Sequence, residues 1–258
     1  MRLATWNVYH GRNPGDGSVD PARLADAVAA LGADALALQE VDRGQPRSAL
    51  IDVTRVAADA MKAVAWGFVP TVVGDPAGRW RPASDDDFGV TSEAYGIALI
   101  SRYPVASWHL LRLAPAPLVR APVLVPGTHD LLWLRDEPRA VLAATLQTPD
   151  GPRTVACTHL SYVPGINVLQ LRRPMHWLRG LTGLRVLMGD LNLPGAVVSR
   201  IAGARLLARA RTYPASRPRW QVDHVVSDGW APTVLGVSAP SLPLSDHAPL
   251  VVDLETSG

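Results

Sequence analysis

Short apolar runs recur along the whole chain, separated by turns rich in polar residues, proline and glycine. Runs of this length and composition predict β-strands. The predicted strands cover 2–8, 35–39, 97–101, 140–146, 153–159, 184–188, 221–227 and 250–254. Because helical patterns fall between some of these strands, the order of elements predicts a layered α/β protein.

Three stretches between the strands have the apolar spacing of a helix. The first helix is predicted to begin after Asp20, with Pro21 in its first turn, and to end at Gly32. Its apolar face would hold Leu24, Val28 and Leu31. The second has its apolar face at Val168, Leu171, Met175 and Leu178. A third helix is predicted from about 48 to about 63.

Two segments, 70–94 and 106–136, are rich in proline, glycine and aspartate and are predicted to be long surface connections. Long connections often shape a binding site. We therefore expect Arg79, Arg81 and the acidic run at 84–87 to lie in a mobile segment near the entrance of a site. Arg79, Arg81 and Tyr95 are our candidate substrate-binding residues.

The composition suits a globular protein with a substantial core, since 48% of the residues are hydrophobic and 19% are charged. A single cysteine excludes a disulfide within the chain and is compatible with a reducing compartment. No apolar run reaches transmembrane length, and the first residues lack the features of a signal peptide. We predict a cytoplasmic protein and expect a monomer.

A formal net charge of +2 does not indicate a general nucleic-acid binder. The basic residues are almost all arginine, which favours coding bias over selection for phosphate contacts. One stretch, 200–219, holds six arginines and no acid. It is interpreted either as a solvated helix and loop or as a patch that attracts an anionic substrate.

Polar side chains stand at the ends of most of the apolar strands. They are Asn7, Gln39, Glu40, His159, Asp190, Asn192, Asp223, Asp246 and His247. A buried carboxylate without a partner is costly. These groups could pair separately, or they could converge on a hard cation that neutralises several carboxylates at once. Asp190 and Asn192 are two residues apart, so in extended backbone both would point to the same side.

Seven short motifs then give the sequence a resemblance that covers nearly the whole chain. In order they are TWNV, QEVD, YGIALISRYPV, THLS, GDLN, QVDHVVS and SDHAPLVVDL. The sequence resembles the endonuclease/exonuclease/phosphatase (deoxyribonuclease I-like) superfamily. The resemblance implies a single domain over 1–258, built as an α/β four-layer sandwich of two mixed β-sheets packed face to face and flanked by helices. It also implies hydrolysis of a phosphoester that depends on Mg²⁺, for which Mn²⁺ is expected to substitute.

The resemblance further implies a metal site and a catalytic set. Glu40 would be the principal metal ligand, with Asn7 beside it and Asp246 as a second carboxylate on the metal side. The catalytic set would be His159, Asp190, Asn192, Asp223 and His247.

The roles in this catalytic set also follow from the resemblance. Asp190 and Asn192 would align the attacking water and bind the phosphate. His247 would contact the phosphate or act as general base, and Asp223 would orient its ring. His159 would stabilise the phosphate or assist the leaving group.

Three positions depart from this pattern or add to it. Ile97 stands where many members of the superfamily have asparagine, which weakens the transfer of any substrate specificity built on that residue. His224 is assigned no catalytic role, and His10 is expected to be a surface residue.

The first interpretation of function is a phosphodiesterase or phosphatase that acts on a small or lipid-derived phosphoester. The alternative is a nuclease, for which 200–219 and Trp220 could supply a basic track and a stacking residue. A non-catalytic scaffold is disfavoured because Glu40, Asp190 and His247 are all present. Cysteine hydrolysis by Cys157 and His159 is also disfavoured, since a lone cysteine in an apolar strand is more often part of the core.

Overall fold

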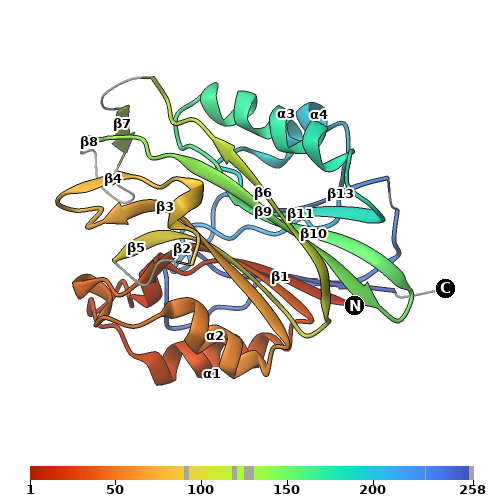
Figure 1. The fold of residues 1–258 in the computed structure, drawn as a ribbon, viewed down its shortest axis with the longest axis horizontal. Coiled ribbons are helices and arrows are strands. Elements are labelled where there is room, and N and C mark those ends of the chain that lie inside the picture. Colours follow the sequence, from red (N-terminus) through yellow and green to blue (C-terminus); the bar gives the residue numbers. More distant parts are fainter. Residues whose placement is uncertain (90–92, 118–120, 125–130, 230, 256–258) are drawn as a thin grey trace.

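The structure, a computed structural model, describes residues 1–89, 93–117, 121–124, 131–229 and 231–255. Two large β-sheets pack face to face, and helices cover the outer face of each sheet (Figure 1). This arrangement confirms the predicted α/β sandwich of two mixed sheets. In the part of the chain that the structure describes, no helix is both long and apolar enough to cross a membrane.

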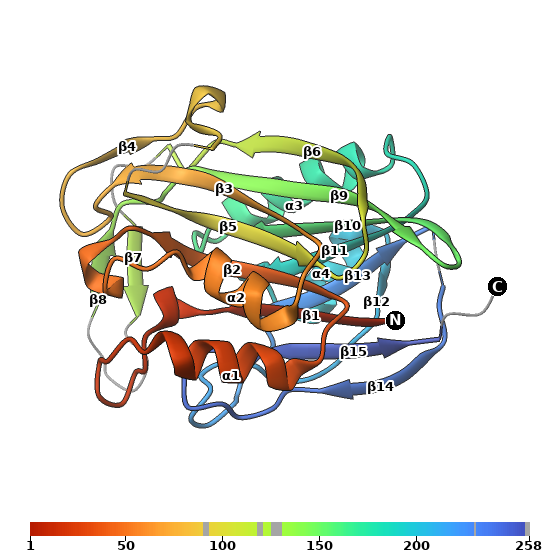
Figure 2. The ribbon, with the colours of Figure 1, turned by 60° about the horizontal axis from the view of Figure 1, so that its bottom comes forward.

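The first sheet has seven strands, and only β1 and β2 run parallel to each other. Figure 2 shows it from the side of its two helices, α1 (Pro21–Leu31) and α2 (Val53–Met61). In spatial order its strands are β14 (Val234–Ser238), β15 (Leu250–Leu254), β1 (Arg2–Asn7), β2 (Ala35–Arg43), β5 (Ala94–Ser101), β3 (Ala65–Gly74) and β4 (Trp80–Pro82).

The second sheet has six strands, of which β10 and β11 form the parallel pair. Helices α3 (Ile166–Leu178) and α4 (Gly195–Ala202) cover its outer face. In spatial order its strands are β12 (Arg205–Leu206), β13 (Asp223–Asp228), β11 (Leu184–Asp190), β10 (Gly151–His159), β9 (Arg139–Thr148) and β6 (Val105–Leu113). A separate ribbon pairs β7 (Ala121–Leu124) with β8 (Leu131–Leu134).

Three layers of buried side chains hold the sandwich together. The alternation of side chains along β1 shows how one strand serves two of them. Leu3 packs between the two sheets, whereas Ala4 and Trp6 pack against the helices of the first sheet. The third layer lies between the second sheet and its helices, and it includes Leu171 and Val198. The sheets thus have buried residues on both faces, so their central strands are apolar runs rather than alternating patterns.

Two predicted helices are confirmed, and the third is wrong at its start. Helix α1 has Asp20 as N-cap and ends at Gly32 in the left-handed conformation, with φ of 59°. The third prediction merged two elements, because a short 3₁₀ helix, Pro46–Ser48, precedes α2. Ala49 and Leu50 between them have φ of 56° and 59°, which a continuous helix cannot contain.

The two segments predicted as long surface connections each contain strands. Residues 70–94 contain the end of β3 and all of β4, and residues 106–136 contain most of β6. Strands β4 and β6 are edge strands. Their outer positions face solvent, which accounts for the polar composition that suggested loops. Parts of the predicted segments, 90–92, 118–120 and 125–130, lie outside the described residues.

Candidate active site

Predicted site residues stand at or near the ends of five strands. The strand order brings these ends together at one end of the sandwich. In the first sheet, Asn7 at the end of β1 is in register with Gln39 of the parallel strand β2. In the second sheet, His159 at the end of β10 is in register with Asp190 of β11. Asp190 is in turn paired with Asp223, the first residue of β13. Side chains that are far apart in the sequence therefore lie side by side along the ends of neighbouring strands.

A cavity of about 530 Å³ opens at this end of the molecule. Seven of the predicted site residues line it: Glu40, Tyr95, His159, Asp190, Asn192, Asp246 and His247. Asn7 and Asp223 are buried and contact members of this group from behind. The structure thus brings together all of the predicted metal-binding and catalytic residues.

Glu40 enters the cavity because β2 bulges at this point. The pairing of β2 with β5 shifts register between Leu38 and Val41, and Glu40 has φ of 54°. Its Oε1 accepts a hydrogen bond of 3.0 Å from Asn7 Nδ2. Burial and the negative charge of Asp246 together raise the pKa of Glu40 to about 7.

The Asn7 amide joins the two sheets at the site. Its Nδ2 donates to Glu40 of the first sheet at 3.0 Å and to Asp190 Oδ2 of the second sheet at 3.2 Å. Its Oδ1 accepts from the backbone N–H of Tyr9 at 3.2 Å, which fixes the amide orientation. Asn7 therefore sets the separation of two carboxylates that would otherwise repel each other.

Asp190 and Asn192 reach the cavity by a turn and not, as we predicted, by extended backbone. Strand β11 ends at Asp190, and Asn192 has φ of 50°. The Asn192 backbone N–H donates to Asp190 Oδ1 at 3.0 Å, and its side-chain Nδ2 donates to the Leu160 carbonyl at 3.0 Å. Burial and the charge of Asp223 raise the pKa of Asp190 to about 6.

His247 forms a buried pair with Asp223, since its Nδ1 lies 3.0 Å from Asp223 Oδ2. The backbone of His247 is held in place as well, because Trp6 Nε1 donates to the His247 carbonyl at 2.8 Å. Burial alone would lower the pKa of His247, but the carboxylates of Asp223, Asp190 and Asp246 outweigh it and raise the pKa to about 10. A carboxylate acceptor at Nδ1 leaves Nε2 facing Asp190 across 3.8 Å.

His159 faces the same carboxylate from the other side, with Nε2 at 3.6 Å from Asp190 Oδ2. Burial and the nearby charges of Arg139 and His247 hold its pKa well below the ordinary value. Two histidines with opposite pKa shifts thus flank Asp190. Such a pair supplies one charged donor and one neutral ring at the same pH.

Several charged residues of the cavity wall were missed by the sequence prediction. Arg139, at the start of β9, has only 5% of its side chain exposed, and its contacts with Asp136 and Glu137 are 3.4 and 3.9 Å long. Arg47 forms a bidentate pair with Asp42 and lies over the ring of Tyr95. A signal for Arg139 was present in the sequence, because charged residues stand directly before the apolar run of β9.

The expectation that His10 is a surface residue is wrong. Its side chain is only 12% exposed, and its Nδ1 lies 3.7 Å from Glu40 Oε2. Burial and the charges of Arg47 and Arg12 lower its pKa to about 3, so the ring is neutral at physiological pH. His10 therefore lines the cavity as a neutral side chain beside Glu40.

Arg79 and Arg81 do not line this cavity, although Tyr95 does. Arg81 donates to both carboxylate oxygens of Asp87, at 2.8 and 2.6 Å, and Arg79 is exposed in the turn between β3 and β4. Arg112 of β6 also holds this region by a hydrogen bond to Asp85 at 2.8 Å. The segment is thus fastened by ion pairs, and contact of Arg79 or Arg81 with substrate stays a prediction.

Cys157 and His224 lie outside the cavity. Cys157 is fully buried between the sheets, and its Sγ lies 3.3 Å from Gln39 Nε2 and 3.4 Å from the Leu38 carbonyl. Burial raises the pKa of this thiol to about 12, which does not favour a nucleophilic thiolate. His224 Nε2 lies 2.8 Å from the Leu193 carbonyl, so its ring serves a buried backbone contact.

The donor set of the site fits a hard divalent cation. The carboxylate oxygens of Glu40 and Asp246 are of the type that Mg²⁺ prefers. The Asn7 oxygen accepts from the Tyr9 N–H, and it is the Asn7 Nδ2 that faces Glu40, so in this structure Asn7 orders the site rather than offering an oxygen to a metal. The repulsion from Asp246 that helps raise the pKa of Glu40 is the interaction that a bound cation would relieve. Ligand atoms of Asp190, Asp223 and His247 also lie within 4.8 Å of one another. Because His247 and Asp223 already contact each other, we expect this second group to act in catalysis rather than to bind the metal, and we call it the catalytic network.

Comparison with solved structures shows the same fold. A protein from Beutenbergia cavernae described as an endonuclease/exonuclease/phosphatase aligns with a TM-score of 0.68 and 23% identity, over 100% of this chain and 72% of that one. The mannosyl-6-phosphatase Bt3783 of Bacteroides thetaiotaomicron aligns with a TM-score of 0.63 and 15% identity, over 99% of both chains. Sphingomyelinase C from Streptomyces griseocarneus aligns with a TM-score of 0.60 and 17% identity, over 98% of both chains.

Comparison of the sequence with curated proteins gives no match. The Endonuclease/Exonuclease/phosphatase family matches residues 4–247, which include the strand ends described above and stop at His247. On this match, the chain belongs to the endonuclease/exonuclease/phosphatase family.

Proposed function

We propose that the chain hydrolyses a phosphoester with the help of a divalent cation, by attack of water at phosphorus. The observation that carries the proposal is the row formed by Asp223, His247 and Asp190 beside the Asn7–Glu40 pair. Membership of the family supports the reaction class. So do the names of two structural neighbours, one a phosphatase and one a sphingomyelinase.

Glu40 and Asp246 would hold the cation, with Asn7 fixing the position of the Glu40 carboxylate. A bound Mg²⁺ would neutralise charge on a phosphoryl oxygen and so favour attack at phosphorus. The buried setting strengthens this interaction, because few waters compete with it. His10 is neutral beside Glu40 and so adds no positive charge to compete with a cation.

The catalytic network would activate and position the attacking water. Asp190 Oδ2 lies 3.6 Å from His159 Nε2 and 3.8 Å from His247 Nε2. These separations exceed a direct hydrogen bond and leave polar atoms directed at a shared space. A carboxylate whose pKa is raised to about 6 is suited to orient water and accept its proton near neutral pH.

The products follow from the same arrangement. The water oxygen forms a bond to phosphorus, the ester P–O bond breaks, and the leaving oxygen takes a proton. His247 carries the proton on its ring at neutral pH and is held by Asp223, so it can stabilise the phosphate charge or supply that proton. Asn192 and His159 line the same space and would bind phosphate oxygens.

The test is turnover of bis(4-nitrophenyl) phosphate and of a panel of phosphomonoesters and phosphodiesters. EDTA should abolish hydrolysis, and added Mg²⁺ or Mn²⁺ should restore it. Glu40→Gln should weaken metal binding in calorimetry and leave the melting temperature of the metal-free protein close to that of wild type. Asp26→Asn, which removes an exposed carboxylate from α1, is the matched control and should bind metal normally. Full activity in EDTA would exclude the metal mechanism.

A further inference from the structure

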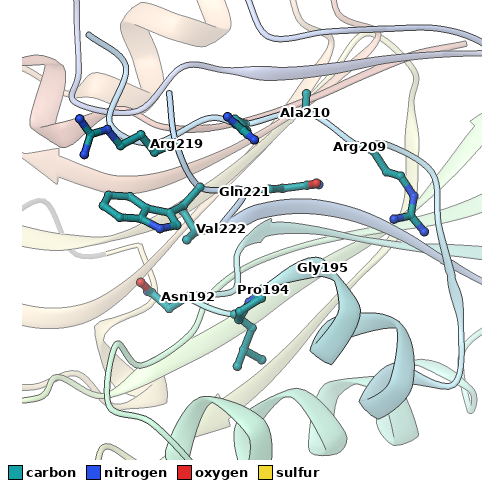
Figure 3. Close-up of a pocket in the computed structure, with 11 residues that line it drawn as sticks. Asn192, Pro194, Gly195, Arg209, Ala210, Arg219, Gln221 and Val222 are labelled. Atoms are coloured by element: carbon teal, nitrogen blue, oxygen red, sulfur yellow. The ribbon is translucent and has the colours of Figure 1, made fainter. Parts of the chain in front are cut away.

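A second cavity, of about 470 Å³, lies next to the catalytic cavity. Asn192, Trp220 and Val222 line both cavities and so form a common wall between them. Figure 3 shows Arg209 and Arg219 on the chain that runs along one side, with Asn192 and Pro194 facing them. A molecule bound across Asn192 would therefore occupy both spaces.

The charge of this second cavity is positive and uncompensated. Arg209, Arg211 and Arg219 line it, and no Asp or Glu is among the described residues that do so. All three arginines are exposed, and within the described chain none of their guanidinium groups has a hydrogen bond or an ion pair. By contrast, Arg47 and Arg81 both form bidentate pairs with carboxylates. Three free guanidinium groups around one cavity are suited to phosphate groups.

The same cavity presents an exposed aromatic surface. Trp220 is 53% exposed, although its backbone is held firmly. The N–H groups of Thr212 and Tyr213 donate to the Trp220 carbonyl at 2.9 and 3.0 Å. In return, the backbone N–H of Trp220 donates to the Tyr213 carbonyl at 2.9 Å. An exposed indole on a braced backbone offers a flat face on which an unpaired base can stack.

The segment that carries these residues also contacts the catalytic network. The Tyr213 ring lies 4.6 Å from the His247 ring, measured between centroids. The Ala215 N–H donates to the Asp246 carbonyl at 2.6 Å, and the Ala248 N–H donates to the Thr212 carbonyl at 2.8 Å. The position of the second cavity is therefore fixed relative to the catalytic network.

We propose that this second cavity binds one nucleotide unit next to the scissile phosphate, so that the substrate is a single-stranded oligonucleotide. The base would stack on Trp220, and the adjacent phosphate would pair with Arg209, Arg211 and Arg219. A single strand is specified because its bases are free to stack, whereas a duplex keeps them paired. The proposal rests on the proposed function, since it extends the same catalytic site.

The experiment measures binding without hydrolysis. A fluorescent, mixed-sequence, single-stranded octanucleotide is titrated with protein in EDTA at two salt concentrations. The variants are Trp220→Leu and a triple variant, Arg209→Ala/Arg211→Ala/Arg219→Ala. Controls are Arg200→Ala, an exposed arginine on α4 that lines neither cavity, and Trp66→Leu, another partly exposed tryptophan. Melting temperatures check that every variant is folded.

Trp220→Leu is expected to weaken binding roughly 5- to 150-fold, the range for loss of one base–aromatic stack. The triple variant is expected to bind more weakly and to reduce the slope of log affinity against log salt by about 0.7, the contribution of one phosphate contact on a single strand. The two controls should bind as wild type does.

Three results would overturn the proposal. The first is that the octanucleotide does not bind, and the second is that the triple variant binds it as tightly as wild type does. The third is that the protein binds vesicles containing phosphoinositides more tightly than it binds the octanucleotide. Failure of the proposed function can be distinguished from failure of this proposal. In that case the octanucleotide would still bind in a way that depends on the arginines and on Trp220, but no phosphoester would be hydrolysed with Mg²⁺.

Discussion

At the scale of single residues, the site is built from backbone that most side chains avoid. Within the described chain, five of the eight residues other than glycine that have positive φ lie at the site: Tyr9, His10, Glu40, Asn192 and Ser245. Such conformations cost on the order of 1–3 kcal/mol each and persist only where surrounding contacts hold them. Ser245, for example, donates its hydroxyl to the Asn7 carbonyl at 2.6 Å. These turns direct consecutive side chains into the cavity where a regular strand would alternate them.

The first prediction concerns the pair formed by His247 and Asp223. His247→Ala and Asp223→Asn should each lower kcat by roughly 10²–10⁴-fold, because the pair positions a charged ring against the phosphate. The double variant should be little worse than His247→Ala, since the two side chains act as one unit. Steady-state kinetics of the single and double variants check this. Losses that multiply independently would show that the pair does not act together.

His159 provides a second test at this scale. His159→Ala should also lower kcat by roughly 10²–10⁴-fold, because the neutral ring lies 3.6 Å from Asp190, beside the space where we propose that the phosphate binds. The measurement is kcat beside the melting temperature of the same variant. A protein that melts early and yet retains its turnover would show that His159 is structural.

The buried thiol gives a prediction about pH. Cys157 has a pKa of about 12 because of burial, so the folded chain keeps a proton that the unfolded chain loses nearer its ordinary pKa. This group therefore makes the folded state less stable as pH rises from the ordinary value toward about 12. At pH 9, iodoacetamide should modify Cys157 in urea but hardly at all in native protein, as mass spectrometry can measure. Fast alkylation of Cys157 in the native protein with loss of activity would instead support hydrolysis by Cys157.

At the scale of elements, strand pairing and helix capping position the site residues. The residues that do so need not contact substrate themselves. The parallel pairs β1–β2 and β10–β11 bring four strand ends to the same edge of the sandwich. Helix α1 follows the loop that contains His10, and its N-terminus depends on Asp20. Asp20 Oδ1 accepts from the backbone N–H groups of Ala22 at 2.9 Å and Arg23 at 3.4 Å.

Asp20→Ala should therefore destabilise the protein by about 1 kcal/mol, the usual cost of losing such a cap. The measurement is urea denaturation, with kcat expected to be unchanged because Asp20 lies outside the cavity. Asp26→Ala removes an exposed carboxylate further along α1 and is the matched control. Equal effects of the two substitutions would contradict a capping role for Asp20.

At the scale of the whole molecule, the site lies where the two sheets meet. Asn7 and Glu40 belong to the first sheet and Asp190 to the second, and the Asn7 amide joins them. The catalytic network is divided in the same way, since Asp223 comes from the second sheet and His247 precedes β15 of the first. Anything that binds these carboxylates therefore also stabilises the packing of one sheet on the other.

A cation that binds only the folded chain should raise the free energy of unfolding. At a concentration 100-fold above its Kd the expected gain is about 2.7 kcal/mol. The melting temperature of wild type should rise with added Mg²⁺, and that of Glu40→Gln should rise much less. Asp26→Asn should respond as wild type does. No response of wild type to Mg²⁺ or Mn²⁺ would contradict a metal site at Glu40.

The sequence by itself determined the layered fold, two of the helices with the caps of one of them, and the set of polar strand ends that lie at the site. These features depend on local spacing and on motifs that stand in the chain itself. Their roles in catalysis stay predictions. The limits of local reasoning appear at 70–94 and 106–136, where the polar faces of edge strands have the composition of loops.

Only the tertiary structure decided how these side chains meet. The bulge at Glu40, the left-handed turn at Asn192 and the burial of His10 depend on neighbours that are distant in sequence. Arg139 and Trp220 belong to the cavity walls because β9 and the segment before β13 lie beside strand ends contributed by other parts of the chain. Side-chain direction and burial are set by strand pairing and packing, and a linear pattern does not contain them.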